Sequence, residues 1–400
     1  MARLAPFRGI RYDTSRTRLA DVTAPPYDVV DDAIRAALAG RDPHNAVHID
    51  LPVPQDGRDR YATACHLFHA WLDEGVLAPD PEPVLYGYRM AFTDDAGVAR
   101  HTTGVLGALV LAAPDEGEIL PHEHTTPKAR SDRLDMLRAC EANLSAIWAL
   151  APAPGLTDAI GAVPAGADTW TDDDGVEHAL WVIDDPERVA VIVERVGSTP
   201  VLVADGHHRY ETSLAYRDER RAASGGDAGA AEATLALVVE LVDDELTVRP
   251  IHRLLEHLPA DTDPVELLAP WFTAGAELDL GGATVAHLEA HGALGLVVGD
   301  ATTVRLLHPR TEALVGARDL DSSRLDVALD ALAGVEVRYQ HGVDEVAAAV
   351  RRGEAAAGVL LRPATVAQIA ATAHGGERMP PKTTFFHPKP RTGVVFRDLR

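Results

Sequence analysis

The stretch VLVADGHHRYET at residues 201–212 decides the fold of this chain. Its first four residues are apolar and predict a short buried strand. A helical pattern follows Gly206 as far as about Ala223, where a Ser-Gly-Gly run at 224–226 ends it. A strand that turns through glycine into a helix presents the first amides of that helix to solvent. Together with the positive end of the helix dipole, such amides form an anion-binding site.

The rest of the chain alternates strand-like and helix-like segments. An amphipathic helix is predicted over residues 60–72, and strands over 84–92 and 102–111 are predicted to form a hairpin around a loop at 93–97. Further predicted elements are strands at 144–150, 234–242, 246–251, 294–298, 303–307 and 358–362, helices at 129–142, 264–272, 324–333, 344–351 and 364–374, and surface loops at 158–168 and 225–231. No internal repeat or coiled-coil heptad is found. The sequence therefore predicts a mixed α/β (α+β) fold.

Length sets the expected number of domains. At about 150 residues per domain, 400 residues suggest two or three. We expect residues 84–245 to form the mixed α/β core that carries the site. An N-terminal region at 1–83 and a C-terminal α/β region at 246–400 are expected to pack around it, and the three regions could also form one continuous domain.

The charge balance excludes several classes of partner. The chain has 37 Lys and Arg against 61 Asp and Glu, which leaves a net charge of −24. Nucleic acid is a poor partner, because non-specific affinity for it comes from Lys and Arg that neutralise phosphates. An anionic membrane surface is disfavoured for the same reason. A small phosphorylated ligand stays compatible, since one local cluster of positive groups can hold it.

The compartment is predicted from cysteines and apolar runs. Cys65 and Cys140 are too few for a disulfide framework or a cysteine zinc site. Residues 1–10 lack the apolar centre of a signal peptide, and the longest apolar run, 104–114, is far shorter than the ~18 residues of a membrane span. These features predict a cytoplasmic protein. They do not indicate its oligomeric state.

The turn at residues 205–209 is the sharpest candidate site. Gly206 lets the backbone approach a ligand closely, and Arg209 with His207 or His208 adds donors for phosphate oxygens. Asp205 is placed to cap the helix or to hold a metal. The alternative interpretation is a capped helix whose histidines are merely polar and exposed.

A second candidate is the segment PHEH at 121–124. Glu123, flanked by His122 and His124 on an irregular loop, suits general-base or metal chemistry. A solvated loop is the alternative. Lys128 and Arg133, just downstream, supply positive charge that could face a phosphate.

A third candidate is the segment MPPKTTFFHPKP at 379–390, which gathers Lys382, a second lysine, a histidine and two threonines in a loop stiffened by proline. Such loops often bring side chains to a site. The alternative is a tail that packs through Phe385 and Phe386. Nowhere does the chain contain a GxxxxGK[ST], GxGxxG or GxSxG motif, so the common nucleotide and hydrolase signatures are absent.

Five ordered segments resemble those of domain-of-unknown-function family 1015. They are PFRG at 6–9, APPYD at 24–28, LPHE at 120–123 with DRL at 132–134, the stretch 204–212, and the segment 379–388. The resemblance covers nearly the whole chain.

The DGHHR string is similar to the phosphate-binding motif of the ParB/sulfiredoxin superfamily, and in particular of its free-serine kinases. That resemblance implies a ParB/sulfiredoxin-like core and a nucleotide, ATP or ADP, with Mg²⁺. It also implies that Glu123 is the catalytic base and that residues 205–209 bind phosphate. The base and the turn, 82 residues apart, are then expected to face one cleft.

The leading hypothesis is a nucleotide-dependent phosphotransferase of serine metabolism, acting on a small hydroxy-amino acid such as free L-serine. Its expected catalytic residues are Glu123, His122 and Asp205, and its expected phosphate-binding residues are Gly206, His207, His208, Arg209, Lys128, Arg133 and Lys382. The alternatives are a metal-dependent hydrolase with His122, His124, His207 and His208 as ligands, and a nucleotide-sensing module without turnover.

Overall fold

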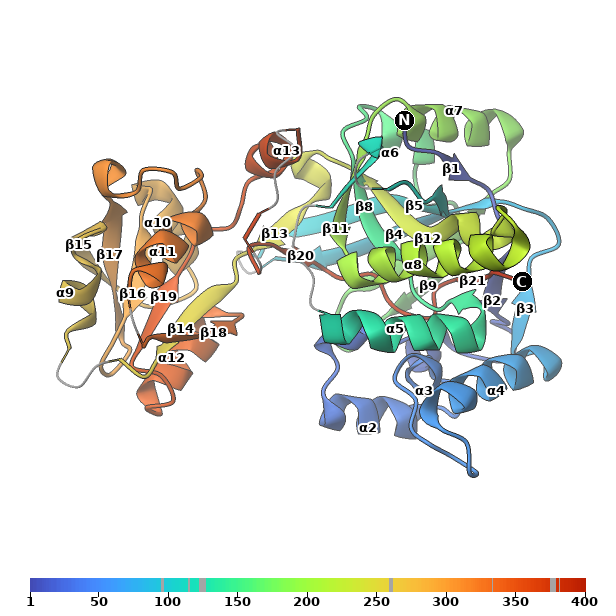
Figure 1. Ribbon diagram of the computed structural model, residues 1–400, viewed down its shortest axis with the longest axis horizontal. Coiled ribbons are helices and arrows are strands. Elements are labelled where there is room, and N and C mark those ends of the chain that lie inside the picture. Colours follow the sequence, from blue (N-terminus) through green and yellow to red (C-terminus); the bar gives the residue numbers. More distant parts are fainter. Residues whose placement is uncertain are drawn as a thin grey trace. The chain divides into compact units, whose positions relative to one another are not determined.

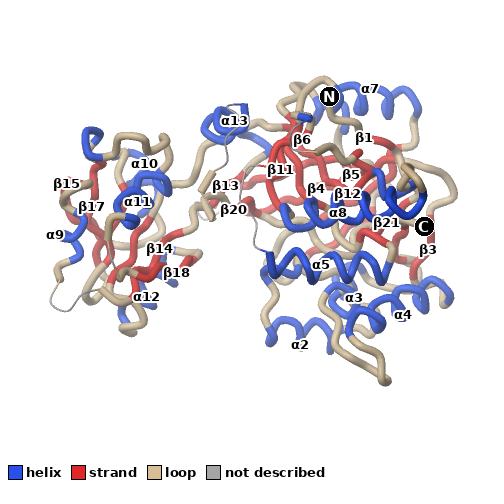
Figure 2. Tube along the Cα trace, viewed as in Figure 1, coloured by secondary structure: helices blue, strands red, loops and turns tan. Residues whose placement is uncertain are grey.

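The computed structural model describes residues 1–94, 97–113, 116–121, 127–258, 262–332, 334–374, 379–380 and 382–400, without the side chains at 121, 127–130 and 373–374. The chain divides into two units (Figures 1 and 2). The first unit comprises residues 1–93, 99–247 and 388–400, and the second comprises 94–98 and 248–387. The three-region division at 83 and 245 remains a proposal.

A nine-stranded sheet, counted over the described residues, forms the centre of the first unit. The strand order is β6-β11-β8-β12-β5-β4-β10-β9, with β1 paired to β5. The β6/β11 and β8/β12 pairs are parallel, and the other pairs are antiparallel. The strands are β1 (Leu4–Ala5), β4 (Leu85–Thr93), β5 (Ala99–Val110), β6 (Ile119–Pro121), β8 (Ile147–Ala151), β9 (Asp168–Thr171), β10 (Glu177–Ile183), β11 (Val201–Asp205) and β12 (Ala233–Glu240).

The apolar runs of β11 and β12 explain their place inside this sheet. Residues 201–204 and 233–239 are buried along their whole length, as expected of strands covered on both faces. The helices of this unit are α1 (Leu19–Val22), α2 (Asp32–Arg41), α3 (Val47–Asp50), α4 (Arg60–Asp73), α5 (Pro127–Cys140), α6 (Leu156–Ile160), α7 (Pro186–Gly197) and α8 (His207–Ser224). Helix α5 packs against both α4 and α8.

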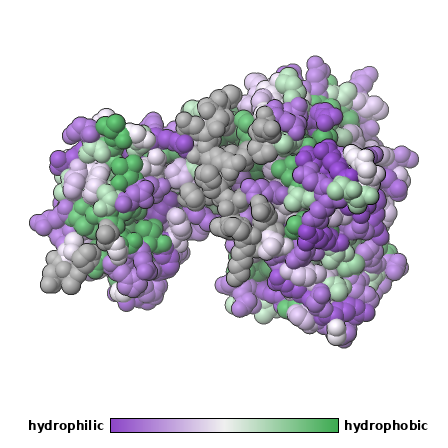
Figure 3. All heavy atoms as spheres, in the orientation of Figure 1, coloured by the Kyte–Doolittle hydropathy of each residue, from purple (hydrophilic) through white to green (hydrophobic). Residues whose placement is uncertain are grey.

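A four-stranded sheet of order β3-β2-β21-β7 completes the first unit. Its strands are β2 (Gly9–Tyr12), β3 (Leu77–Pro79), β7 (Ala142–Asn143) and β21 (Phe396–Asp398). In the view of Figure 3 the surface over α5 and α8 is mostly hydrophilic, in keeping with the ion pair that joins Arg138 to Glu219 across these helices.

The second unit is a sheet with helices on both faces. Its described strands follow the order β15-β17-β16-β19-β14-β18. Apolar residues of α10 and α12 form one core cluster with the sheet, and those of α9 and α11 form another. The elements are β14 (His252–Glu256), α9 (Pro264–Leu268), β15 (Phe272–Asp279), α10 (Thr284–His291), β16 (Leu294–Val297), β17 (Thr303–Pro309), α11 (Asp321–Asp330), β18 (Glu336–Gln340), α12 (Val343–Arg351), β19 (Ala357–Leu360) and α13 (Val366–His374), with β13 (Thr247–Arg249) and β20 (Phe385–His387) as a separate pair.

The structure confirms the mixed α/β class, the strand and helix over 201–224, and the hairpin strands over 84–111. The centre of the hairpin loop, residues 95–96, lies outside the described residues. The predicted loop at 158–168 is wrong in part, because α6 runs to Ile160. Leu156 and Ile160 are fully buried, and this apolar pair is hidden among alanines and glycines. The predicted helix at 264–272 is too long, since α9 ends at Leu268 and β15 begins at Phe272.

Over the described residues, none of the helices combines the length and the apolarity that crossing a bilayer requires.

Candidate functional site

The turn between β11 and α8 is built around a glycine that no other residue replaces without strain. Gly206 has φ 87° and ψ 29°, a left-handed conformation, and a Cβ there would lie 2.9 Å from Nε and Nη2 of Arg209. The first helical hydrogen bond runs from the Tyr210 amide to the Gly206 carbonyl at 2.9 Å. The amides at 207–209 therefore point out of the helix end. This end of an 18-residue helix carries positive partial charge.

Asp205 closes β11 and gathers two cations around its carboxylate. Its Oδ2 lies 2.8 Å from Nη2 of Arg209, and its Oδ1 lies 2.8 Å from Nζ of Lys389. Lys389 also pairs with Asp28, so one ammonium group joins two carboxylates. Burial raises the pKa of Asp205, but Lys389 and Arg209 outweigh it and lower the pKa to about 2. Asp205 is thus a fixed anion between positive groups.

The same balance keeps Lys389 charged. Burial lowers the pKa of its ammonium group, but Asp205 and Asp28 raise that pKa by more than burial lowers it, so the net shift is upward. The Lys389 side chain is only 10% exposed. A charged lysine is therefore held in place beside the end of helix α8.

Arg209 is fixed from the other side by the loop before β8. Its Nη1 donates to Oγ of Ser145 at 3.1 Å and to the carbonyl of Ala146. Its Nε is buried and has no hydrogen-bond acceptor within the described part of the chain. A buried donor without an acceptor costs about 1–3 kcal/mol.

Arg133, which the sequence predicts to bind phosphate, contacts two carboxylates. Its Nη1 lies 3.0 Å from Oδ1 of Asp50 and its Nη2 lies 2.8 Å from Oδ2 of Asp132. Its guanidinium carbon lies 4.3 Å from the ring centroid of Tyr27, the residue before Asp28. Burial lowers the pKa of Arg133, but the carboxylates raise it above its ordinary value. Arg133 thus holds the segment that presents Asp28 to Lys389.

A small cavity of about 50 Å³ lies between α5 and the start of α8. Arg133, Arg209, Asp50 and Ser145 contribute polar groups to its lining. It has room for one or two water molecules, at about 30 Å³ each. Apolar side chains of Met136, Leu137 and Leu144 line the rest of it, so Arg133 and Arg209 meet at a cavity of mixed character.

The second predicted segment begins at the same sheet edge as the turn. Strand β6 runs parallel to β11, and its last residue, Pro121, pairs with Val203. His122, Glu123 and His124 follow Pro121 in the sequence and lie outside the described residues. The expectation that Glu123 and the turn face one cleft therefore stays a prediction.

The remaining predicted residues are distributed as follows. Asp205, Gly206 and Arg209 lie together at the turn, where His207 is buried and His208 is partly exposed. Lys128 lies in the first turn of α5, and its side chain is not among the described ones. Lys382 belongs to the second unit. Its role in phosphate binding remains a prediction.

Sequence reasoning missed Asp28 and Lys389, although both lie in segments that it singled out. Asp28 ends the APPYD segment, and Lys389 stands between two prolines in the segment 379–390. The signal that could have found Lys389 is its position in the more rigid, proline-flanked part of that loop.

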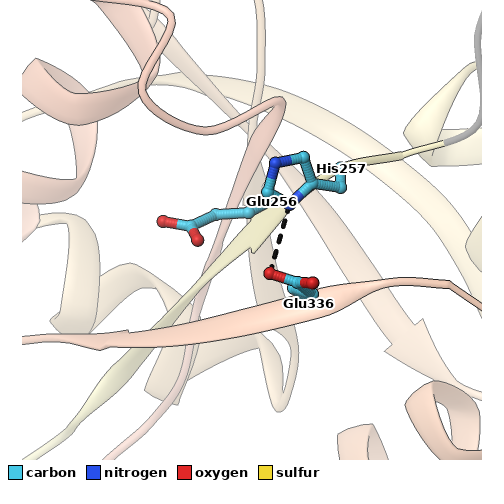
Figure 4. Close-up of side chains that lie close together, drawn as sticks. All are labelled: Glu256, His257 and Glu336. Atoms are coloured by element: carbon cyan, nitrogen blue, oxygen red, sulfur yellow. Dashed lines mark ion pairs between the residues drawn. The ribbon is translucent and has the colours of Figure 1, made fainter.

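A metal-dependent hydrolase requires metal-ligating side chains that lie close together. Over the described residues, one group of three His, Cys, Asp or Glu ligand atoms lies within 4.8 Å, and it is Glu256, His257 and Glu336 in the second unit. Figure 4 shows His257 facing Glu336, with Nδ1 at 3.3 Å from Oε2. Glu256 is already paired with Nε of Arg338 at 2.6 Å. These contacts form an exposed network of ion pairs.

Three comparisons place the chain among known proteins. A family model described as "Protein of unknown function (DUF1015)" matches residues 4–328. None of the curated proteins matches this chain. Among solved structures, a free serine kinase in complex with AMP is 14% identical, with 71% of this chain and 86% of that chain covered and a TM-score of 0.35.

Two further solved structures are similar at the same level. A variant of a free serine kinase in complex with ADP is 13% identical, with 71% of this chain and 87% of that chain covered and a TM-score of 0.36. C-terminally truncated SbnI from Staphylococcus aureus is 12% identical, with 72% of this chain and 85% of that chain covered and a TM-score of 0.39. These are distant resemblances in fold, and no activity follows from them.

Proposed function

Because the chain belongs to the DUF1015 family of proteins of unknown function, whose description names no reaction, we propose a function from the site itself. The first unit is a nucleotide-dependent phosphotransferase that acts on the hydroxyl of a small hydroxy-amino acid such as free L-serine. The observation that carries this proposal is the turn at 205–209, where Arg209 and Lys389 flank the N-terminus of α8.

Phosphate binding follows from the charges at this turn. The amides at 207–209, the Arg209 guanidinium and the Lys389 ammonium are donors of the kind that hold phosphate oxygens. Arg209 keeps a buried Nε that has no acceptor among the described residues. A nucleotide's terminal phosphates supply acceptors for these donors.

Asp205 and Asp28 suit Mg²⁺, which prefers carboxylate oxygens and phosphates. Both carboxylates contact Lys389, so a divalent cation and the ammonium group would compete for the same oxygens. When bound, Mg²⁺ neutralises the charge of the transferring phosphoryl group. Asp205 and Asp28 are the residues that would hold it.

The general base is assigned to Glu123 on the resemblance to free-serine kinases. Its carboxylate takes the proton from the acceptor hydroxyl, as a bond forms from that oxygen to phosphorus and the bond from phosphorus to the nucleotide oxygen breaks. The pairing of Pro121 with Val203 supports this role, because Glu123 follows Pro121 by two residues.

A phosphorus NMR panel of ATP and ADP against serine, threonine and homoserine tests the proposal. The expected result is a new phosphomonoester signal with serine. Arg209→Ala should weaken nucleotide binding in calorimetry by about 10- to 100-fold, since it removes a charged donor. Arg220→Ala, on the exposed side of α8, is the matched control and should leave binding unchanged.

Each negative outcome has its own meaning. Nucleotide binding without a phosphorylated product from any acceptor would replace the phosphotransferase with a nucleotide sensor. No nucleotide binding would overturn the role of the turn as a phosphate site.

A further inference from the structure

The second unit contains a polar cavity that the proposed phosphotransferase does not use. Its volume is about 220 Å³, and it lies where the segment after β19 meets the first turns of α11 and α13. The side chains that matter for its chemistry are Asp321, Arg362, Glu289, Ser322 and Thr383. All of them belong to the second unit.

A buried ion pair forms one wall of this cavity. The Asp321 side chain is 2% exposed. It accepts hydrogen bonds from three nitrogens of Arg362. Nη2 of Arg362 lies 2.5 Å from Oδ1, while its Nε and its amide lie 2.9 Å and 3.0 Å from Oδ2. This bidentate contact fixes the plane of the guanidinium group. The Nη1 of Arg362 has no acceptor among the described residues, so one charged donor is left over.

Glu289 supplies the opposite charge at the same cavity. Its side chain is exposed, and none of the described residues forms an ion pair or a hydrogen bond with its carboxylate. Its charge nevertheless raises the pKa of Arg362, whose shift comes first from the Asp321 hydrogen bond. The cavity therefore offers a left-over cationic donor and a left-over anionic acceptor.

Hydroxyl groups complete the lining. Oγ of Ser322 lies 2.8 Å from Oγ1 of Thr383, which also donates to the carbonyl of Pro380 at 2.8 Å. The start of α13 is already capped, because the Thr365 amide donates to Gln368 Oε1 and the Gln368 amide donates to Thr365 Oγ1. The helix end is thus satisfied, and the ligand chemistry rests on the side chains of the cavity.

We propose that this cavity binds a free α-amino acid with a small side chain. The ligand's carboxylate accepts from Nη1 of Arg362, and its ammonium group pairs with Glu289. A lone anion would leave Glu289 unpaired and close to it, and a lone cation would face Arg362, whereas a zwitterion satisfies both. The cavity volume of about 220 Å³ gives room for a small amino acid.

Calorimetry on the full chain tests this proposal with glycine, alanine and serine as probes. Propionate and propylamine, each carrying one half of the zwitterion, serve as probes for the separate charges. The amino acids should bind, and each half-ligand should bind at least 10-fold more weakly. Glu289→Gln should weaken amino-acid binding by 10-fold or more, while Glu312→Gln, an exposed glutamate of the same unit that is not part of the cavity, should leave it unchanged.

Arg209→Ala separates this site from the acceptor site of the proposed phosphotransferase. Amino-acid binding that persists in Arg209→Ala and is weakened in Glu289→Gln supports the cavity in the second unit. Binding that is lost in Arg209→Ala and unaffected by Glu289→Gln overturns it and assigns the ligand to the first unit. Ser322→Ala gives a second variant in the lining and should weaken serine more than glycine. An absence of binding by every amino acid also overturns the proposal, whatever the phosphorus NMR panel shows.

Discussion

Both units place an aspartate at the beginning of a helix and neutralise it with an arginine, yet the surrounding groups differ. Asp205 precedes α8 by two residues, and Asp321 is the first residue of α11. At α8 the aspartate is shared by two cations, Arg209 and Lys389. At α11 the guanidinium group of Arg362 binds both oxygens of the aspartate, and Nη1 of Arg324 lies 3.3 Å from Oδ1. The same local arrangement therefore suits a phosphate in one unit and a zwitterion in the other.

The largest expected effect concerns the catalysis that we propose for the first unit. Glu123→Gln should lower phosphotransfer by roughly 10²–10⁴, the range for loss of a general base, and should leave nucleotide binding nearly intact. The rate is measured by phosphorus NMR and the binding by calorimetry. Glu187→Gln, an exposed glutamate at the start of α7, is the control and should behave as the wild type. Equal rates for the wild type and Glu123→Gln would remove the base from the mechanism.

The next largest expected effect is on the free energy of unfolding, when Arg362 or Arg209 is removed from its aspartate. Arg362→Met leaves the fully buried Asp321 with Nη1 of Arg324 at 3.3 Å, and we expect a loss of about 3–5 kcal/mol in the free energy of unfolding. Arg209→Met leaves Asp205 with Lys389 at 2.8 Å, and we expect about 1–3 kcal/mol. Urea denaturation of both variants measures the difference. Equal losses would show that Lys389 does not compensate for Arg209.

The sequence could predict those parts of this site whose contacting residues lie close together along the chain. Val201–Asp205 and the turn at Gly206 were found because an apolar run, a glycine and a helical pattern are local signals. The Lys389–Asp28 pair joins residues 361 positions apart, and no local pattern announces it. The sequence predicts a phosphate-binding role for Lys382, from the same segment as Lys389. The structure assigns Lys382 to the second unit and Lys389 to the first, since the boundary falls before Pro388.

A similar limit explains the interpretation of Arg133. The sequence predicts that Arg133 supplies positive charge that could face a phosphate, but it does not show the partners of Arg133. Asp50 and Tyr27 come from the first fifty residues and reach Arg133 only through tertiary packing. A charge read from sequence is therefore a poor guide to whether that charge is available to a ligand.

The pH dependence of stability should report on the ion pairs of Asp205. The pKa of Asp205 is about 2 in the folded protein, below the unfolded value of about 3.9. A depressed carboxyl pKa contributes stability that is present above pH ~4 and is lost as the pH falls toward 2, here about 2–3 kcal/mol. Lys389→Met should remove most of this contribution, because Lys389 is the strongest of the groups that lower the pKa.

Urea unfolding at pH 3, 4, 5 and 7 measures that difference. The gap between wild type and Lys389→Met should be widest at pH 5 and above and should narrow at pH 3. Lys382→Met is the control from the same segment and should show the wild-type dependence. A gap that stays constant with pH would contradict the role of Lys389 in holding Asp205 ionised.

The smallest expected effect concerns the backbone, where the two helix starts differ most plainly. Leu320 precedes α11 in an ordinary extended conformation, with φ −141°, whereas Gly206 precedes α8 with φ 87°. Gly206→Ala should cost about 1–2 kcal/mol for the left-handed conformation, plus the cost of displacing Arg209 from a Cβ only 2.9 Å away. Gly225→Ala, at the other end of α8, is matched in φ at 83° but meets no atom within 4 Å. The difference in unfolding free energy between the two variants isolates the contact with Arg209. Because that contact orients a phosphate donor, Gly206→Ala should also weaken nucleotide binding, and Gly225→Ala should not.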